Sequence, residues 1–431
     1  MKTFALFNTD FYQLSMMLGY ILSDIATERT GFEAFTRKLN PKVTDRNAYR
    51  FAGQGDLIQY IKQIQTELQD PELLDTFLKI VIPKVPEHQD VIALKVVEKW
   101  PQLMANTKFT INMLDTGEPV HPLVPAVQYI GPRWIGQLIE TPVICMINGE
   151  TARFTAGLKP HDLGAYIAAL IERATAYRKA TQKPLLEAGF RRAPSFGQAA
   201  LASTIAMKCG WNGTSNVAAL QRGLVTLDQV GGTMAHAFVL SYDTELEAFW
   251  TWHDVFPGTT QLTDTHDVNS AIQLLIDNNL KPRDVRIDCS PLDELCVSAR
   301  AQMDRQGWMD VGIFATGDMT PELLVDFEAR DIPFTKTMAG TKYVNPPGFD
   351  DQECGFVYKI VEYTRNETKH CPQKTTTGKR NYPGLKSVAF DSVRNEVIVD
   401  CNPEKPGYDH ASLKLANPDA NVVFVNTGED A

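Results

Sequence analysis

Hydrophobic residues recur at helical spacing near the start of the chain, and they predict a helix over residues 10–23. Asp10, with Gln13 three residues later, is a candidate cap for the first turn of this helix. Tyr12 lies off its hydrophobic stripe. The residues that share the stripe are Phe11, Leu14, Leu18 and Ile21.

Residues 259–345 hold the most regular pattern of the chain. Short hydrophobic runs alternate with helical patterns in units of roughly 25 residues, which is the size of a βα step in a parallel sheet or barrel. Residues 214–240 fit two more such steps. The predicted strands are 261–264, 285–288, 311–314 and one that opens at 333–336, and the predicted helices are 268–277, 292–304 and 321–330.

Charged and small residues follow several of these predicted strands. In βα barrels the residues that carry the chemistry lie at the carboxyl ends of the strands. The sequence therefore predicts an active site at one mouth of a barrel. The residues at these ends are Asp264, Arg286, Asp288, Gly317, Asp318, Gly340 and Thr341.

The two flanks of the chain differ from its centre. Residues 54–110 alternate helical patterns with prolines and predict a helical N-terminal region. Residues 357–361 predict an edge strand, and alternating strands follow at 387–390 and 396–400, so we expect a β-rich tail that returns to the N-terminal region. A chain of 431 residues fits two domains, or one barrel with a large addition.

Composition narrows the class of protein. The net charge is −10, which argues against a broad nucleic-acid surface because such a surface is basic. Seven scattered cysteines without a CxxC pair indicate a reducing compartment, hence the cytoplasm. We expect no membrane span and no export signal. Cys354, Cys371 and Cys401 lie near His370 and His410 in the sequence, but their spacing fits no usual zinc pattern.

Two turns could carry chemistry or be purely structural. The turn at residues 213–216 exposes backbone N–H groups and hydroxyls that suit an anion, but a simple helix cap explains it equally well. His236 follows a tight turn of small residues. It is a candidate proton carrier or nucleophile, and the plainer alternative is a buried histidine bonded to backbone.

Two groups of charged residues have the same ambiguity. Arg191 and Arg192 could bind a carboxylate or phosphate, or form surface ion pairs. Arg286 and Asp288 lie on the same face of one strand, because side chains alternate with period two. They could form a structural ion pair, or bind a pyrophosphate and a ribose hydroxyl.

Nine short motifs, taken in order, resemble nicotinate phosphoribosyltransferase over residues 9 to about 390. Nicotinamide phosphoribosyltransferases share much of this frame. The motifs are TDFYQ (9–13), EAGFRRA (187–193), GTSNV (213–217), GTMAH (232–236), DTHD (264–267), RID (286–288), GTK (340–342), VYK (357–359) and GK…PGLK (378–386).

The resemblance implies a type II phosphoribosyltransferase fold. In this fold an irregular α/β barrel, here residues 141–356, lies beside an α+β domain built from residues 1–140 and the β-rich tail 357–431. It also implies a homodimer or higher homo-oligomer with the active site at the subunit interface. Tyr12 would stack on the pyridine from the partner subunit, and Arg191 would lie near its acid group.

The resemblance further implies that nicotinate receives the phosphoribosyl group of phosphoribosyl pyrophosphate, giving nicotinate mononucleotide in NAD salvage. ATP and Mg²⁺ are the implied cofactors, His236 is phosphorylated by ATP, and Arg286 and Asp288 act at the phosphoribosyl group. No side chain is assigned as a metal ligand. The residues expected to bind substrates are Tyr12, Arg191, Thr214, Ser215, Asn216, Thr233, Asp318, Gly340 and Thr341.

Two departures from the family pattern keep alternatives open. Ala188 replaces a phenylalanine that forms the second face of the ring sandwich, unless Phe190 or Phe196 fills the gap. Residues 289–291 read Cys-Ser-Pro, where the family has a glycine and an acid. The alternatives are transfer to nicotinamide or another pyridine-like base, and a non-catalytic nucleotide-binding paralogue.

Overall fold

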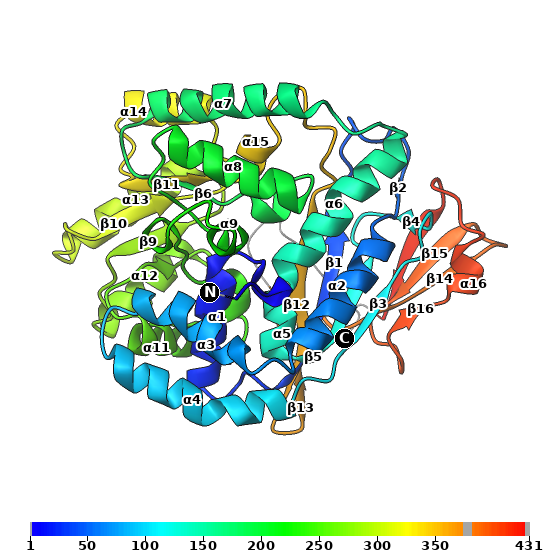
Figure 1. Ribbon diagram of the computed structural model, residues 1–431, viewed down its shortest axis with the longest axis horizontal. Coiled ribbons are helices and arrows are strands. Elements are labelled where there is room, and N and C mark those ends of the chain that lie inside the picture. Colours follow the sequence, from blue (N-terminus) through cyan, green and yellow to red (C-terminus); the bar gives the residue numbers. More distant parts are fainter. Residues whose placement is uncertain (1, 374–381, 427–431) are drawn as a thin grey trace.

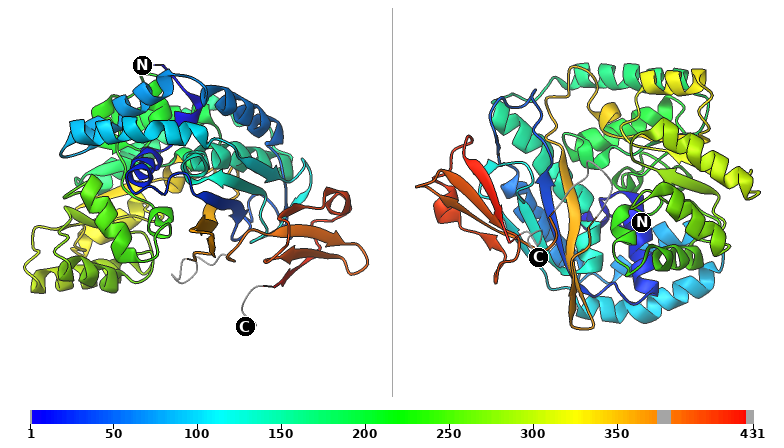
Figure 2. Two further views of the ribbon diagram at one scale, coloured as in Figure 1. Left: turned by 90° about the horizontal axis from the view of Figure 1, so that it is seen from below. Right: turned by 180° about the vertical axis from the view of Figure 1, so that it is seen from behind.

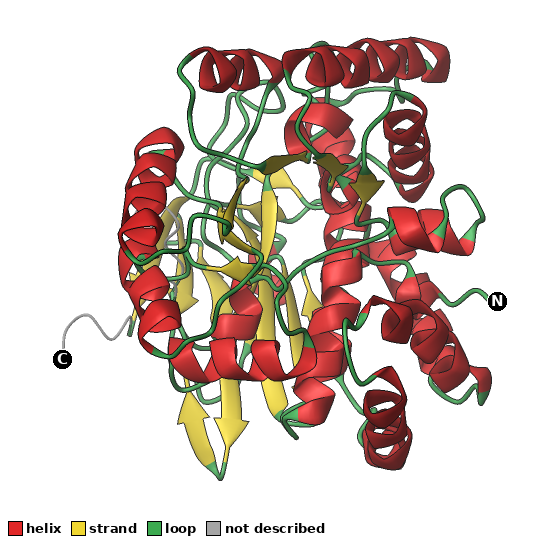
Figure 3. Cartoon of the chain, turned by 90° about the vertical axis from the view of Figure 1, so that its left-hand side faces the viewer, coloured by secondary structure: helices red, strands yellow, loops and turns green. Residues whose placement is uncertain are grey.

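The computed structural model of the chain describes residues 2–373 and 382–426. It is a mixed α/β structure that contains a parallel sheet, as the sequence predicted, and helices lie outside the strands on several sides (Figure 3). Gly378 and Lys379, the beginning of the last motif, lie outside the described residues.

The parallel sheet has six strands in the order β7-β6-β11-β10-β9-β8, at the left of Figure 1. Strands β9 and β10 are buried along their whole length, which suits the hydrophobic runs that predicted them. Within the described residues no ladder joins β7 to β8. The strands are β6 (Leu185–Glu187), β7 (Gly213–Thr214), β8 (Gln261–Leu262), β9 (Asp284–Ile287), β10 (Gly312–Ala315) and β11 (Lys336–Ala339).

Helices follow the strands of this sheet, as the βα pattern predicted. Asp267 and Thr320 cap two of them by accepting hydrogen bonds from Ser270 N and Leu323 N. The helices of this part are α7 (Leu163–Ala180), α8 (Phe196–Lys208), α9 (Val217–Gln221), α10 (His236–Val239), α11 (Glu245–Val255), α12 (Val268–Asp277), α13 (Leu292–Arg305), α14 (Pro321–Ala329) and α15 (Thr341–Val344), with short 3-10 turns η3 (Phe190–Arg192) and η4 (Leu227–Gln229).

The segment 214–240 differs from the two βα steps expected there. It contains β7 and helices α9 and α10, and a single bridge between Thr214 and Val230 stands where a second strand was expected. Gly231 and Gly232 follow this bridge directly. Glycine weakens a strand, because it has no side chain to pack, and the chain here continues as a loop.

The antiparallel sheet joins both ends of the chain, in the order β13-β12-β1-β5-β3. The strand expected at an edge from residue 357 onward lies between β1 and the short β13. The strands are β1 (Arg29–Thr36), β3 (Thr110–Met113), β5 (Val127–Pro132), β12 (Phe356–Arg365) and β13 (Thr368–His370), with a separate pair β2 (Tyr49–Arg50) and β4 (Pro119–Val120).

The N-terminal region is helical, as predicted, and its first helix is buried on more than one face, because Met16, Met17 and Tyr20 are buried as well as the predicted stripe. Its helices are α1 (Phe11–Leu22), α2 (Gln54–Glu67), α3 (Glu72–Val81), α4 (Gln89–Ala105), α5 (Arg133–Leu138) and α6 (Glu140–Ala156), with the 3-10 turns η1 (Ala5–Phe7) and η2 (Ile82–Lys84).

The predicted capping of α1 by Asp10 is wrong. The Asp10 side chain makes no capping hydrogen bond; it accepts hydrogen bonds from Ser215 Oγ and from Thr141 Oγ1, the latter at 2.7 Å. Gln13 donates to Glu140 instead of returning to the helix start. The carboxylate of Asp10 therefore joins the first helix to the end of β7, since the two hydroxyls compete successfully with the helix backbone.

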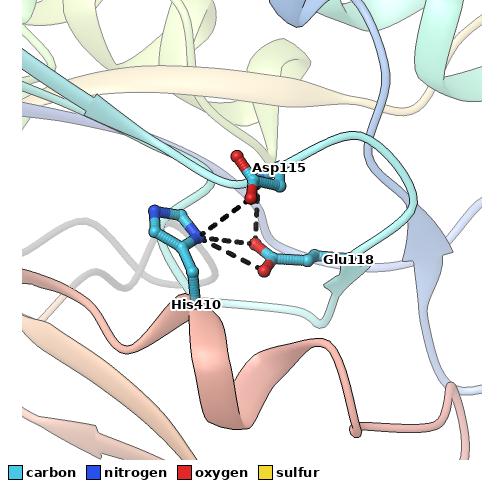
Figure 4. Close-up of side chains that lie close together, drawn as sticks. All are labelled: Asp115, Glu118 and His410. Atoms are coloured by element: carbon cyan, nitrogen blue, oxygen red, sulfur yellow. Dashed lines mark hydrogen bonds and ion pairs between the residues drawn. The ribbon is translucent and has the colours of Figure 1, made fainter.

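The tail forms a four-stranded sheet in the order β16-β14-β15-β17, which projects from one end of the molecule (Figures 1 and 2). The tail contacts residues of the N-terminal region, where His410 Nδ1 lies 3.1 Å from Glu118 and near Asp115 (Figure 4). The tail comprises β14 (Ser387–Asp391), β15 (Glu396–Asp400), β16 (Gly407–Tyr408), α16 (His410–Leu413) and β17 (Asn421–Val425).

No helix among the described residues combines the length and the apolar composition that a membrane crossing requires.

Candidate active site

A cavity of about 930 Å³ opens at the carboxyl ends of the parallel strands and reaches the side of β12. It collects nearly all of the candidate residues that the sequence indicated, although they come from distant parts of the chain. Those that line it are Tyr12, Arg191, Thr214, Ser215, Thr233, His236, Arg286, Asp288, Asp318, Gly340 and Thr341.

His236 begins helix α10 and is almost fully buried. Its Nδ1 lies 3.2 Å from the hydroxyl of Thr265, while Nε2 faces Asp264 at 3.7 Å and Asp288 at 3.8 Å. The ring is thus oriented by a hydroxyl on one side and by carboxylates on the other. A purely structural histidine would be bonded to backbone, whereas His236 has a hydroxyl and two carboxylates as its neighbours.

Arg286 enters the cavity from the end of β9. Its Nη1 donates to Thr233 Oγ1 at 2.6 Å, whereas its buried Nε has no hydrogen-bond partner among the described residues. Burial lowers the pKa of Arg286, although Asp288 and Asp264 act in the opposite direction. A buried guanidinium with an unused donor is suited to an anion that enters the cavity, because such a donor costs free energy until it is paired.

Tyr12 and Arg191 meet at the other side of the cavity. Arg191 Nη1 donates to Glu140 Oε1 at 3.0 Å. Burial and the nearby Glu140 raise the pKa of Tyr12 well above its ordinary value. Tyr12 lines the cavity of its own chain, together with His236, whereas the resemblance implied that this ring serves the site of a partner subunit.

The sequence left open whether the turn after β7 binds an anion or caps a helix, and its residues differ in this respect. Thr214 and Ser215 line the cavity, but their hydroxyls already donate to Glu187 at 2.5 Å and to Asp10. Asn216 does not line the cavity; it is fully buried and caps helix α9 by accepting from Ala219 N at 3.1 Å. For Asn216 the structure shows a helix cap and no exposed anion-binding group.

Glycines let the backbone approach closely around the cavity. A Cβ on Gly340 would lie 2.8 Å from the carbonyl oxygen of Ala188, and one on Gly232 would lie 2.7 Å from Tyr12 N. Gly317 has a φ of +99°, which favours glycine, and a Cβ there would lie 3.0 Å from Asp288 Oδ1. Asp318 and Asp288 are thereby brought to the same part of the cavity wall.

No second aromatic ring replaces the phenylalanine missing at Ala188 from within its own segment. Ala188 lines the cavity, whereas Phe190 and Phe196 are absent from the lining and pack edge-to-face on each other, with ring centroids 5.5 Å apart. Phe190 is buried in the core. Neither ring therefore lines the cavity beside Ala188, because the two rings pack on each other.

Several cavity residues were not singled out by the sequence. Glu140 and Arg37 line the cavity beside Arg191, and burial together with Arg192 and Arg191 lowers the pKa of Arg37 to about 10. Nothing in the sequence marks either residue, because each lies far from the motifs it joins in space. The other basic residues of the lining are Lys84, Arg192, Arg283, Lys336, Lys342 and Lys359.

A group with the geometry of a metal site lies elsewhere. Asp115, Glu118 and His410 form the one such group among the described residues, and it contains none of the cysteines considered as zinc ligands (Figure 4). Lys414 lies 3.4 Å from Asp115 and places a positive charge in the same cluster.

Two proteins with similar sequences are named for the same activity. The nicotinate phosphoribosyltransferase pncB2 of Mycobacterium tuberculosis is 29% identical over 403 residues, which cover 89% of this chain and 75% of that protein. The nicotinate phosphoribosyltransferase of Bacillus subtilis is 26% identical over 396 residues, covering 88% of this chain and 72% of that protein. The chain is a relative of the nicotinate phosphoribosyltransferases. The resemblance inferred from the nine motifs is thus confirmed.

The fold supports the same relationship. The crystal structure of nicotinate phosphoribosyltransferase from Porphyromonas gingivalis superposes with a TM-score of 0.66 at 17% identity, and covers 88% of this chain and 96% of that one. No family model matches the chain. At this identity the structural likeness concerns the fold, and the chemistry has to be argued from the cavity.

Proposed function

We propose that the chain is an enzyme of NAD salvage that transfers the phosphoribosyl group of phosphoribosyl pyrophosphate to nicotinate, releasing nicotinate mononucleotide and pyrophosphate. The observation that carries this proposal is one cavity with a basic, incompletely paired end at Arg286 and an aromatic and cationic end at Tyr12 and Arg191. Such a cavity suits a flat acidic ring beside a polyphosphate. The related transferases support it.

At the pyridine end, the ring of Tyr12 offers one stacking face and Arg191 offers donors to the carboxylate of nicotinate. Stacking and charge pairing together hold the ring nitrogen in line with the ribose C1′, which lowers the barrier by orientation. Ala188 leaves the opposite face of the ring without an aromatic partner from its own segment.

At the phosphate end, departure of pyrophosphate leaves positive charge on C1′ and adds negative charge to the leaving group. The unused Nε of Arg286 is a donor for that group. Asp288 and Asp318 fit a Mg²⁺ ion bound together with pyrophosphate oxygens, because this ion prefers carboxylate and phosphate oxygens. The ion would neutralise charge on the leaving pyrophosphate.

We further propose that His236 couples transfer to ATP. The terminal phosphoryl group of ATP moves to a ring nitrogen of His236 while ADP departs, and water later releases phosphate and restores the imidazole. Asp264 and Asp288 hold the Nε2 side of the ring, and Thr265 holds Nδ1. Only a neutral imidazole nitrogen can accept the group.

The remaining parts of the proposal concern architecture. We propose that the parallel strands belong to an irregular barrel domain, residues 141–356, and that residues 1–140 and 357–431 form the second domain. The pairing of β1 with β12 supports the joining of both chain ends. We also propose a cytoplasmic homodimer or higher homo-oligomer, in which a partner subunit adds to the site that Tyr12 already lines.

A turnover assay tests the function. The protein is incubated with phosphoribosyl pyrophosphate and Mg²⁺, with nicotinate, nicotinamide or quinolinate, and with or without ATP. We expect nicotinate mononucleotide, faster with ATP. His236→Ala should abolish the stimulation by ATP, while His253→Ala, outside the cavity lining, should retain it.

Two outcomes would favour the alternatives. Faster turnover of nicotinamide than of nicotinate would favour the amide as substrate, an outcome that the missing ring at Ala188 makes worth measuring. No turnover of any pyridine, together with calorimetric binding of ATP, would favour a non-catalytic nucleotide-binding paralogue. Equal stimulation of His236→Ala and the parent would refute the role of His236.

A further inference from the structure

Glu140 is a charged residue in the cavity wall that the transfer chemistry above does not use. It is the first residue of helix α6 and its side chain is 7% exposed, while the side chain of Arg191 beside it is 32% exposed. A carboxylate in the first turn of a helix is stabilised by the helix dipole. Glu140 is therefore a fixed negative charge directly behind the residue expected to receive the pyridine acid.

The two oxygens of Glu140 have different partners. Oε1 accepts from Arg191 Nη1 at 3.0 Å, on the cavity side. Oε2 accepts from Gln13 Nε2 at 2.8 Å and from Gln137 Nε2 at 3.3 Å, on the core side. Two glutamine side chains thus hold the carboxylate in place, so that one oxygen remains directed at the guanidinium.

Neighbouring groups favour the charged form of Arg191. Burial alone would lower the pKa of Arg191, but Tyr12, Glu140 and Asp10 outweigh it and raise the pKa. The pair of Arg191 and Glu140 carries little net charge, yet the guanidinium keeps donors that are accessible from the cavity. An incoming carboxylate is consequently bound mainly through oriented hydrogen-bond donors, because Glu140 offsets much of the positive charge of Arg191.

The adjacent arginine provides an internal comparison. Arg192 Nη1 donates to Glu353 Oε1 at 2.9 Å, nearly the same distance as in the first pair. The side chains of Arg192 and Glu353 are about equally buried, at 14% and 15% exposure. Glu353 does not line the cavity. The two pairs share their chemistry and their neighbourhood, but the arginine of the Glu140 pair is the more exposed of the two, at 32% against 14%.

We propose that Glu140 is a positioning and specificity-determining residue that sets the preference of the pyridine pocket between an acid and its amide through Arg191. This inference rests on the proposed function, because it assigns Arg191 to the substituent of the pyridine ring. Glu140 orients the guanidinium, and at the same time offsets its charge, which limits the advantage of nicotinate over nicotinamide.

Substitution Glu140→Gln tests the charge and keeps the shape. The amide oxygen still accepts from Arg191, whereas the opposing negative charge is gone. The ratio of kcat/KM for nicotinate over nicotinamide should rise at least about threefold, mainly through a lower KM for nicotinate, since an unscreened charge attracts only the acid. Glu353→Gln is the matched control, and its ratio should stay within about twofold of the parent's.

A second variant guards against loss of structure. Gln13→Glu combined with Glu140→Gln keeps one buried carboxylate and the same count of donors and acceptors, but moves the charge one side chain away from Arg191. Its ratio should lie between those of the parent and Glu140→Gln. Calorimetric titration of nicotinate and nicotinamide into each variant reports the same preference without turnover.

The outcomes separate the two proposals. Equal losses for both pyridines in Glu140→Gln and in the double variant, or the same shift in Glu353→Gln, would overturn the role of Glu140 and leave the transferase function standing. If the parent turns over neither pyridine, the proposed function fails. Tighter calorimetric binding of nicotinate by Glu140→Gln would then still support the control of Arg191 by Glu140, and unchanged binding would overturn it.

Discussion

Charged side chains are buried at two places in this molecule, and their hydrogen bonding differs between the two. One is the contact between the C-terminal tail and strand β1, where Lys386 meets Glu33. The other is the cavity at the end of β9, where Arg286 lies near Asp288. Both cations are almost fully buried, so burial alone does not distinguish them.

In the tail contact the ammonium group of Lys386 is fully satisfied. Lys386 Nζ donates to Glu33 Oε2 at 2.6 Å and to the carbonyl oxygens of Tyr382 and Gly384. Glu33 Oε1 accepts from Lys386 N at 3.0 Å and from Gln128 at 2.9 Å. An ammonium group has three protons to donate, and all three are used here. No capacity remains for a ligand.

The cavity leaves the guanidinium of Arg286 incompletely paired. Its buried Nε has no hydrogen-bond partner among the described residues. These two cations differ in the satisfaction of their hydrogen bonds and not in burial, so Arg286 keeps a donor for a ligand whereas Lys386 does not.

The largest expected effect is on turnover by Arg286→Met. Loss of the guanidinium removes a donor to the leaving group, and kcat/KM should fall about 100- to 1,000-fold. The free energy of unfolding should fall by less than it does for Lys386→Met, because the variant loses the bond from Nη1 to Thr233 but leaves Asp288, a carboxylate with 31% of its side chain exposed to water. Steady-state kinetics and urea unfolding measure the two. A stability loss as large as the loss of activity would contradict the comparison.

Lys386→Met should have the opposite profile. It leaves the carboxylate of Glu33 buried without its cation, which costs about 3–5 kcal/mol of stability. Turnover per folded molecule should remain close to that of the parent. The double variant Glu33→Gln with Lys386→Met is the control, and it should recover most of the stability because no unpaired charge remains. A folded Lys386→Met protein without activity would show that the tail contact serves the site.

The sequence predicted the parallel sheet well, for a local reason. Each strand and helix of residues 259–345 carries its own hydrophobic period, and parallel strands must end on one side of the sheet. Arg286, Asp288, Asp318 and Thr341 could therefore be assigned to one cavity from their positions alone, and the structure places them in its wall.

The rest of the site depends on contacts between distant segments. The pairing of Glu140 with Arg191 joins residues 51 positions apart and leaves no local pattern. Asp10 looked like a helix cap, because the sequence cannot reveal that Ser215 and Thr141 supply competing hydroxyls. Asn216 belongs to the same short motif as Ser215, yet only the structure shows which of them faces the cavity.

Asp10 makes a pH-dependent contribution to stability, although both of its carboxylate oxygens accept a hydrogen bond. Burial raises its pKa from an ordinary 3.8 to about 7, although hydrogen bonds from Ser215 and Thr141 counteract this. The folded protein thus holds this proton more tightly than the unfolded chain does. The associated stability is fully present below pH 3.8 and is lost as the pH rises toward about 7.

Asp10→Asn should remove this dependence, since an amide does not titrate and can still accept from a hydroxyl. The free energy of unfolding of the parent should fall relative to that of the variant as the pH rises from about 4 to about 7. Urea unfolding across this range measures the difference. Parallel pH profiles for the two proteins would show that Asp10 is already ionised at low pH in the fold.

The smallest expected effect is at Ala188, which lines the cavity at the position where the family pattern has a phenylalanine. A stacked ring is worth about 0.5–1.5 kcal/mol beyond the area it buries, which is up to about tenfold in affinity. Ala188→Phe should lower the KM for nicotinate by up to that factor and leave kcat nearly unchanged, as expected for uniform binding. Steady-state constants on several pyridines check this.

A competing account of Ala188 is that it makes room for a bulkier base. Phe190 and Phe196 pack on each other away from the cavity, so the space beside Ala188 is not filled by its own segment. On this account the phenylalanine would block the larger base and leave nicotinate a poor substrate. A lower KM for nicotinate alone favours stacking, and a loss confined to the larger base favours the wider pocket. No effect on any pyridine would show that residue 188 does not face the ring, and would place the sandwich elsewhere in the cavity.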